Sequence, residues 1–231
     1  MSSVSALYHN NDALTFDQLS PHSCRCKNML IGLTGTYCTG KNHIASLLEA
    51  RGLPVLDVDK LGYKALEMEK ETIFARFGAD IQRPDGSLDR RLLGQRVFGK
   101  PEKLAALENI VHPVANRLTD EWIAAQSAPC VINAALLHRS SVFDRLDRII
   151  IVTAPLFTRL LRAKRRDRLS WTAILRRFAS QKNFNPQYLA VNAEIYRVGN
   201  PGLFGSRNLH RESKARKKLE SRIEKILEGI R

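Results

Sequence analysis

A glycine-rich stretch near the amino terminus has the residue types and the spacing that phosphate binding requires. Residues 35–42 read GTYCTGKN, in which a lysine directly follows the second of two glycines. Glycine lets the backbone approach a ligand closely, and the amide hydrogens at the start of a helix point at anions. We therefore expect backbone amides and the amine of Lys41 to bind the phosphates of a nucleotide. The expected nucleotide-binding residues are Gly35, Thr36, Tyr37, Cys38, Thr39, Gly40, Lys41, Asn42 and His43.

Asn42 stands where the pattern G-x-x-x-x-G-K-[ST] has a serine or threonine, whose hydroxyl binds magnesium. Its side-chain oxygen is a neutral acceptor that can ligate Mg²⁺ directly or hold a metal-bound water. A second asparagine, Asn133 in the segment VINAALL, takes the place where such sites usually carry an aspartate beside the metal. We predict that Asn42 is a metal ligand. The two replacements leave open whether the site turns substrate over or only binds it.

Two carboxylates, Asp57 and Asp59, end the segment LPVLDVD. Residues two apart on an extended strand face the same side, so we expect both side chains to point into one cleft. One of them would lie beside Mg²⁺, and the other would accept a proton from a substrate hydroxyl. The residue types alone leave open which of the two is the base.

Four apolar segments predict the strands that position these residues. They lie at residues 29–35, 53–59, 128–137 and 147–155, and a helical pattern at residues 41–52 directly follows the glycine-rich loop. Strands that alternate with helices predict an α/β fold with a parallel, doubly wound sheet. Ligands of such sheets gather beyond the carboxyl ends of the strands, where the loop and both carboxylates are expected.

The spacing of these segments also predicts the domain organisation. The helical pattern between the second and third strands is longer than a simple crossover needs, which predicts a helical insertion at about residues 60–127. A basic run opens a predicted lid at about residues 159–185, and an amphipathic helix ends the chain. Residues 1–28 are polar and are predicted to be a flexible extension of one domain formed by residues 29–231; translation could begin at Met29.

The composition narrows the class of partner and the compartment. A net charge of +14 and a pI of 10.0 favour nucleic acid or a small anion that carries several phosphates. No apolar run approaches the roughly 20 residues of a membrane span, so we predict a soluble protein without a membrane partner. Four cysteines form no C-x-x-C pair, which predicts reduced thiols and a cytoplasmic location.

Taken together, these segments resemble the dephospho-CoA kinase family. The resemblance rests on IGLTGTYCTGKNHIA, LPVLDVDKLGYKAL, RFASQK and the long stretch FGADIQRPDGSLDRRLLGQRVFGKPEKLAALENIVHPVANR. It spans residues 29–199 in the order and spacing of the family. It implies a three-layer P-loop kinase fold with an inserted helical subdomain that binds CoA and a basic lid. It also implies ATP-dependent phosphorylation of the ribose 3′-hydroxyl of dephospho-CoA, the final step of coenzyme A biosynthesis.

The resemblance implies roles for individual side chains. Asp59 matches the acid that accepts the 3′-hydroxyl proton, which places Asp57 nearer to Mg²⁺. Arg162 and Arg166 match lid arginines that close over the phosphates.

In the helical insertion, His112 matches a family landmark that either touches substrate or packs the helix. The usual arginine four residues after it is replaced by Asn116, and its neighbour Arg117 is the expected substrate contact. Arg139 follows the third predicted strand in LLHR, where it and His138 replace an acid and an aromatic residue of the family. We hypothesise that the added positive charge of Arg139 binds polyphosphate directly.

Three classes of function follow from these patterns. The favoured one is an active, ATP-dependent and Mg²⁺-dependent kinase whose partners are ATP and dephospho-CoA. The alternative is a relative that binds nucleotide or CoA without turnover, which the replacements at Asn42 and Asn133 motivate. A P-loop protein that acts on another hydroxyl or binds nucleic acid is disfavoured by the family segments. The sequence leaves the oligomeric state open.

Overall fold

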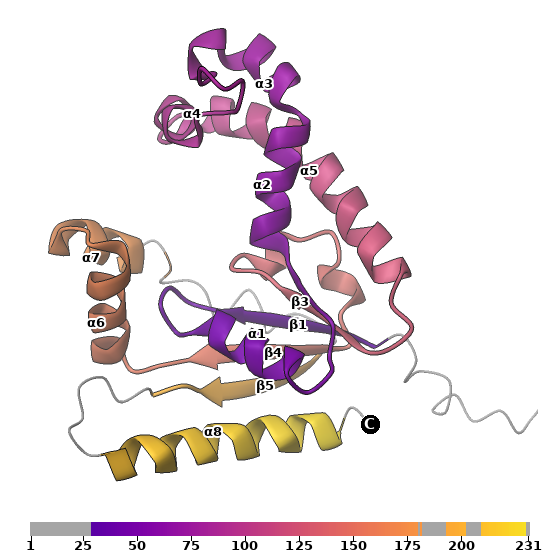
Figure 1. Cartoon of the computed structure of the whole chain (residues 1–231), viewed down its shortest axis with the longest axis vertical. Coiled ribbons are helices and arrows are strands. Elements are labelled where there is room, and N and C mark those ends of the chain that lie inside the picture. The colour runs from indigo at the N-terminus through magenta and orange to yellow at the C-terminus, as the bar shows by residue number, and fades with distance from the viewer. Residues whose placement is uncertain (1–28, 180, 182–192, 202–208, 230–231) are drawn as a thin grey trace, which may run out of the picture.

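The computed structural model describes residues 29–179, 181, 193–201 and 209–229. Five strands form one parallel sheet in the order β2-β3-β1-β4-β5, as Figure 1 shows. The strands are β1 (Leu30–Gly35), β2 (Val55–Asp57), β3 (Cys130–Asn133), β4 (Arg148–Thr153) and β5 (Glu194–Gly199). The predicted α/β fold with a parallel sheet is confirmed. The prediction for residues 1–28 lies outside the described residues.

The fifth strand was not among the predicted elements. β5 pairs with β4 along its whole length, from Arg148 opposite Glu194 to Thr153 opposite Gly199. Glu194 and Arg197 are exposed and, of its six residues, only Val198 is fully buried, so the apolar run is too weak to indicate a strand. Although few of its own side chains are buried, β5 is stabilised by its pairing with the buried strand β4.

One face of the sheet is covered by α1 (Lys41–Glu49) and α8 (Leu209–Glu228). α1 buries Ile44 and Leu48, and α8 buries Leu219, Ile223 and Ile226 at helical spacing. The opposite face packs against the carboxyl end of α5 and two short 3-10 segments, η3 (Leu137–Arg139) and η4 (Phe143–Arg145). These layers hold the carboxyl ends of all five strands at one edge.

A helical arm lies between β2 and β3 in the chain: it begins at the carboxyl end of β2 and returns through its last helix to the amino end of β3 (Figure 1). It contains α2 (Val58–Met68), α3 (Lys70–Phe77), η2 (Ala79–Ile81), α4 (Arg90–Val97) and α5 (Pro101–Ala124). Asp89 caps α4 by accepting from the amides of Arg91 and Leu92, and a proline opens α5, where no amide hydrogen is needed. Ile73, Ile81 and other arm residues form an apolar cluster of their own.

The helices α6 (Leu156–Asp167) and α7 (Trp171–Ala179) follow β4 and stand beside the glycine-rich loop. Ala163 and Ile174 are fully buried and pack with Cys38 of that loop. Leu160, Leu169 and Phe178 complete the contact. The described residues of the predicted lid, 159–179 and 181, therefore contact the loop through a small apolar core. None of the helices in the described ranges is long and apolar enough to cross a membrane.

Candidate active site

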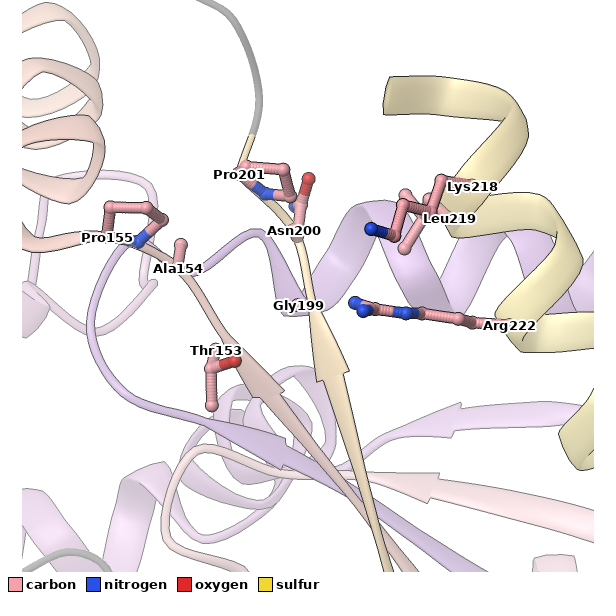
Figure 2. A pocket seen from close by; sticks show the side chains of 9 residues that line it. All are labelled: Thr153, Ala154, Pro155, Gly199, Asn200, Pro201, Lys218, Leu219 and Arg222. Carbon is pink, nitrogen blue, oxygen red and sulfur yellow. The ribbon is translucent and has the colours of Figure 1, made fainter. Parts of the chain in front are cut away.

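Two pockets flank the loop between β1 and α1, each with a volume of about 510 Å³. One lies at the carboxyl ends of β4 and β5, and Figure 2 shows Lys218 and Arg222 of α8 pointing toward it. The other lies between α2, α5 and the segment after β3. Because β1 lies between β3 and β4 in the sheet, the two pockets lie on opposite sides of the strand that leads into the glycine-rich loop.

The loop turns into α1 at Gly40, which has φ 90°. A side chain at this position would be strained and would also collide with the Asn200 amide, whose nitrogen lies 2.2 Å from the position of an added Cβ. Cys38 also has a positive φ, 62°, whereas Thr36 does not. Of the two, only Cys38 therefore has a backbone conformation that favours glycine, and its side chain is buried against α6 and α7.

Asn200, directly after β5, forms a hydrogen bond to the backbone of the glycine-rich loop. Its side-chain nitrogen donates to the carbonyl oxygen of Thr39 at 2.9 Å, and it is 6% exposed. The sequence analysis did not select this residue as part of the site. The segment RVGN, where β5 ends, was the available signal, because polar residues just beyond a strand of this sheet face the ligand edge.

Two arginines of α6 contact the backbone of the loop. Arg162 donates to the carbonyl oxygens of Thr39 at 2.8 Å and of Cys38 at 3.3 Å. Arg159, which was not predicted to be a site residue, donates to the carbonyl oxygen of Tyr37 at 2.9 Å. Burial lowers the pKa values of Arg159 and Arg162 from their ordinary value. Part of the basic run therefore holds α6 against the loop.

Arg166 lies over the ring of Tyr37, with 5.2 Å between its guanidinium carbon and the ring centroid. It also pairs with Asp167, which accepts hydrogen bonds from Arg177 and from the hydroxyl of Tyr37. The hydrogen bond from Arg166 is the main cause that lowers the pKa of Asp167 below its ordinary value of 3.8. Asp167 is therefore ionised at neutral pH and gathers three donors around the loop.

We expect Asp167→Asn to loosen this contact of α6 and α7 with the loop. Removing the charge weakens hydrogen bonds that are worth about 1–3 kcal/mol when one partner is ionised. The folded-state pKa is lowered, so the stabilisation is complete above the ordinary value of 3.8 and is lost as pH falls through the folded-state pKa. Thermal unfolding of the variant should thus show a lower Tm at pH 7, and the difference should shrink in acid.

The matched control is Asp120→Asn. Asp120 forms an exposed ion pair with Arg145, and such pairs contribute little to stability. A Tm difference of Asp167→Asn that equals that of this control, or that does not shrink as pH falls below 3.8, would contradict the assigned role.

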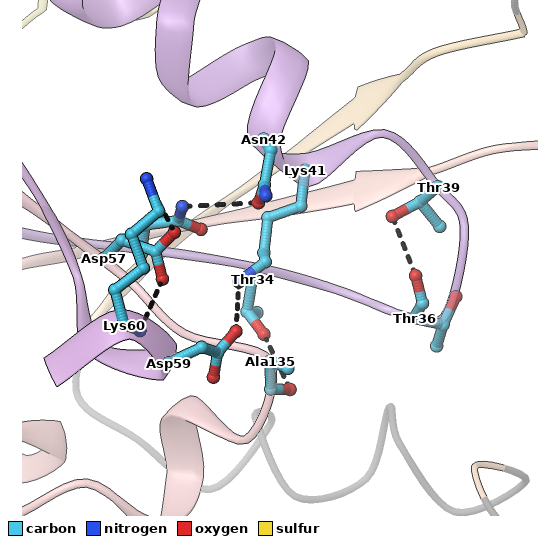
Figure 3. Close-up of polar contacts among 10 residues, drawn as sticks. Thr34, Thr36, Thr39, Lys41, Asn42, Asp57, Asp59, Lys60 and Ala135 are labelled. Carbon is cyan, nitrogen blue, oxygen red and sulfur yellow. Dashed lines mark hydrogen bonds and ion pairs between the residues drawn. The ribbon is translucent and has the colours of Figure 1, made fainter. Parts of the chain in front are cut away.

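Lys41 and Asp59 form an ion pair across the cleft, with 3.2 Å between Nζ and Oδ2 (Figure 3). The lysine side chain is 11% exposed and the aspartate 52%. The expectation that Asp57 and Asp59 both lie on an extended strand is wrong, because β2 ends at Asp57 and α2 begins at Val58. The helical turn places Asp59 toward the loop, while Asp57 caps α2 by accepting from the Lys60 amide at 3.3 Å.

Asn42 and Asn133 lie side by side although 91 positions separate them. Asn133 ends β3, is 2% exposed and donates from Nδ2 to Oδ1 of Asn42 at 3.5 Å. The sheet register places Asn133 directly opposite Asp57 of β2. Two amides and one carboxylate thus gather at the carboxyl edge next to Lys41, which is a set of oxygen ligands that suits Mg²⁺.

The pocket beside α2 and α5 contains Asp59 and most of the residues predicted to bind substrate. His112 and Arg139 line it, and Arg117 does not. Arg117 pairs instead with Glu121 on the exposed side of α5, while its neighbour Asn116 lines the pocket. The complete lining is Val58, Asp59, Gly62, Tyr63, Leu66, Leu107, Glu108, Val111, His112, Ala115, Asn116, Ala134, Ala135, Leu136, Arg139 and Ser140.

His138 and Arg139 add less positive charge to the pocket than their residue types suggest. Burial is the main cause that lowers the pKa of His138, with a further contribution from Arg139, so the imidazole is neutral at pH 7. Arg139 forms two hydrogen bonds with Glu108, at 2.9 and 3.0 Å. The arginine is therefore charge-balanced on this wall of the pocket.

A parallel sheet in the order 2-3-1-4-5, a glycine loop that opens the helix after β1, and a lysine facing an aspartate define a P-loop kinase. A sequence model of the family described as dephospho-CoA kinase matches residues 29–193. The dephospho-CoA kinase of Treponema pallidum is 36% identical over 188 residues, which are 77% of this chain and 89% of that protein. That of Thermus thermophilus is 38% identical over 154 residues, which are 66% and 75%.

Solved structures agree with these sequence similarities. The crystal structure of TT1252 from Thermus thermophilus is 32% identical, has a TM-score of 0.65, and matches 84% of this chain and 97% of that one. The chain belongs to the dephospho-CoA kinase family, and the protein is an ATP-dependent kinase of that family. A dephospho-CoA kinase from Campylobacter jejuni, 22% identical with a TM-score of 0.56, shares the fold over 89% of this chain and 98% of that one.

Proposed function

We propose that this protein transfers the terminal phosphoryl group of ATP to the ribose 3′-hydroxyl of dephospho-CoA, giving CoA and ADP. One observation carries the proposal: Asp59 borders both halves of the site. It pairs with Lys41 of the glycine-rich loop and also lines the pocket beside α2 and α5. A hydroxyl in that pocket would therefore lie between its base and the phosphates on the loop, as phosphoryl transfer requires.

ATP would bind along the loop, with its phosphates on the backbone amides at the start of α1 and on Lys41. The pocket at the carboxyl ends of β4 and β5 would take the adenosine. Asn200 supports this assignment, because it lines that pocket and its amide also donates to the loop at Thr39. Arg162 and Arg166 would stabilise charge on the transferred group when the lid closes.

Asp59 would act as the base. When phosphates draw Lys41 away from the ion pair, the Asp59 carboxylate becomes free to accept the 3′-hydroxyl proton. Asp57 is less suited to this role because it caps α2 and also faces Lys60, whose Nζ lies 3.9 Å from Oδ2. Lys41 would neutralise negative charge on the phosphates while the hydroxyl oxygen attacks.

Magnesium fits the oxygen atoms at the edge of the sheet. Oδ1 of Asn133 is buried and has no hydrogen-bond partner among the described residues, and Asp57 lies opposite it in the register. Asn42 and Asp57 would hold the ion or its water shell. When bound, Mg²⁺ would neutralise charge that develops between the β- and γ-phosphates.

The helical arm would bind dephospho-CoA, with His112 and Arg139 on the wall of its pocket. Arg117 would reach substrate only by leaving its ion pair with Glu121, in which Nη1 and Oε1 lie 2.7 Å apart. The division of the chain into a helical insertion at about residues 60–127 and a lid at about residues 159–185 remains a prediction. A cytoplasmic location, where ATP and magnesium are plentiful, is likewise proposed.

The proposed reaction is tested by incubating the purified protein with ATP, Mg²⁺ and dephospho-CoA. We expect ADP release that depends on dephospho-CoA, together with a product whose new phosphate is on the 3′ position by ³¹P NMR. CoA itself, whose 3′-hydroxyl is already phosphorylated, is the control acceptor. ADP release that is equal with dephospho-CoA and with CoA would contradict the proposal.

Arg139→Ala is expected to weaken binding of dephospho-CoA more than binding of ATP. The substitution removes a cation from the substrate pocket and leaves the Glu108 carboxylate unpaired there, which repels an anionic substrate. Loss of one charged contact corresponds to about a tenfold rise in KM for dephospho-CoA.

Steady-state kinetics with each substrate varied in turn measure this effect. Arg145→Ala, which removes an exposed arginine that pairs with Asp120 outside the pocket, is the matched control. An equal rise of both KM values, or the same change in the control, would contradict this role for Arg139.

A further inference from the structure

Three cations of α8 form a row along one side of the helix. Lys218, Arg222 and Lys225 stand at positions i, i+4 and i+7, so their side chains leave the same side of α8. Like charges at this spacing repel one another and destabilise a helix. None of these side chains forms a hydrogen bond or an ion pair within the described part of the chain. An anion bound beside the row would relieve the repulsion.

Two acids of α8 and β5 pair with other cations. Oε1 of Glu224 on α8 lies 2.5 Å from Nε of Arg51, and Oε2 of Glu194 on β5 lies 3.2 Å from Nε of Arg148. The described residues that line the pocket at the carboxyl ends of β4 and β5 include no carboxylate. The row of cations therefore keeps an uncompensated positive charge beside that pocket.

Glycine at the end of β5 lets Arg222 reach this pocket. Nη1 of Arg222 lies 3.0 Å from the position that a Cβ atom would take at Gly199. A side chain at Gly199 would therefore crowd the guanidinium. Figure 2 shows Arg222 and Lys218 extending from α8 toward this strand end. Both side chains line the pocket that would take the adenosine.

A neighbouring pocket of about 420 Å³ provides space beyond an adenosine. It shares Thr153, Gly199 and Arg222 with the first pocket. Lys225 lines it as well, and no carboxylate is among its described lining residues. Arg222 thus stands where the two pockets meet, with Lys218 in the lining of the first and Lys225 in that of the second.

The structure of a nucleotide limits which anion could lie there. Its 5′-phosphates would occupy the loop before α1, and adenine is uncharged at neutral pH. An anion at this end of the nucleotide would therefore be a phosphate ester on the ribose. Arginine binds phosphate through two parallel hydrogen bonds, and lysine binds it as a point charge. ATP has no ribose phosphate, so these cations would distinguish nucleotides that carry one.

We propose that Arg222 and Lys218 bind a phosphate on the ribose of an adenosine nucleotide. This inference rests on the proposed function, which places adenosine in this pocket. CoA belongs to the ligand class, because it is an adenosine 5′-diphosphate with a phosphate on its 3′ oxygen. It would occupy the nucleotide site in competition with ATP, so product that accumulates would slow the reaction. Dephospho-CoA, which lacks this phosphate, would compete with ATP much less.

The probes are ADP and adenosine 3′-phosphate 5′-diphosphate, which differ by one phosphate. Each displaces a radiolabelled, non-hydrolysable ATP analogue from the full chain in equilibrium dialysis. The 3′-phosphate is expected to strengthen binding about tenfold, the effect of one charged contact. In Arg222→Ala and in Lys218→Ala this advantage should fall to about twofold or less. The ratio of the two affinities decides, because a general loss of nucleotide binding lowers both alike.

Lys217→Ala is the matched control, because Lys217 is an exposed lysine of α8 that lines neither pocket. This variant should keep the full advantage of the 3′-phosphate. Arg222→Lys retains the charge without the fork of donors and should keep part of it. Circular dichroism of each variant verifies folding, and if one alanine variant fails to fold, the other decides.

A 3′-phosphate advantage that is lost in the alanine variants and kept in Lys217→Ala would support the inference. Equal binding of the two probes to the unaltered protein, or an advantage that persists in Arg222→Ala and Lys218→Ala, overturns it and leaves the proposed function standing. An advantage that Lys217→Ala loses equally reflects the total charge of α8 and also overturns it. Failure of the unaltered protein to bind the ATP analogue overturns both.

Discussion

Replacing Asp59 with asparagine is expected to lower kcat by about 10²–10⁴-fold, the contribution of a general base. The amide has nearly the same shape but cannot accept the hydroxyl proton. It also no longer forms the ion pair with Lys41, whose nitrogen lies 3.2 Å from the carboxylate. Lys41 would then be available to phosphate at all times, so ATP affinity should be unchanged or higher.

Loss of a catalytic base lowers turnover without weakening nucleotide binding, whereas loss of a structural residue lowers both. ADP release gives kcat, and calorimetry with a non-hydrolysable ATP analogue gives affinity. Loss of both quantities together in Asp59→Asn would indicate a distorted site and contradict the assignment.

Asp57→Asn is the matched comparison for the same measurements. Its side chain caps α2, and an asparagine oxygen can still accept from the Lys60 amide. We expect kcat at saturating Mg²⁺ to fall much less than in Asp59→Asn, and the Mg²⁺ concentration needed for half-maximal rate to rise. A larger fall in kcat for Asp57→Asn than for Asp59→Asn would indicate that Asp57 is the base and that Asp59 lies beside Mg²⁺.

The second large effect is expected for Lys41→Ala, with a fall in kcat of about 10²–10³-fold, as for removal of one group that stabilises developing charge. The lysine is 11% exposed and reaches from the start of α1 into the space between the loop and Asp59. Its loss removes the one side-chain cation within the loop sequence, and it leaves Asp59 without its partner. ATP affinity should fall as well, in contrast to Asp59→Asn.

The control for this prediction is Lys103→Ala, which removes an exposed lysine of α5. Activity that survives in Lys41→Ala would contradict the assigned role. Absence of turnover in the unaltered protein, despite tight binding of ATP or CoA, would instead favour a binding protein built on the same fold.

Most of the phosphate-binding half of the site was predictable from sequence. The loop, the strand before it and the helix after it depend on local features: two glycines, a lysine and the spacing of apolar residues. The same local features reveal four of the five strands. β5 was missed because its neighbour β4 provides most of its stabilising contacts, and that pairing leaves little trace in a six-residue segment.

Contacts between distant segments were not predictable in this way. Arg162 and Asn200 both bind the carbonyl oxygen of Thr39, although more than 120 residues separate each of them from it. The strained backbone of Cys38 is compatible with folding because its side chain packs against α6 and α7. Such contacts depend on where complete helices and strands come to lie.

The sequence by itself determined the class of site, because residue type and spacing specify a loop of amides and a lysine that can bind phosphate. It also determined the family, through long segments in a characteristic order. Only the tertiary structure decided which acid serves that loop. The chain turns from strand to helix between Asp57 and Asp59, which directs Asp59 to Lys41 and leaves Asp57 as a helix cap. Strand order likewise brings Asn133 to Asn42, because β3 lies next to β1.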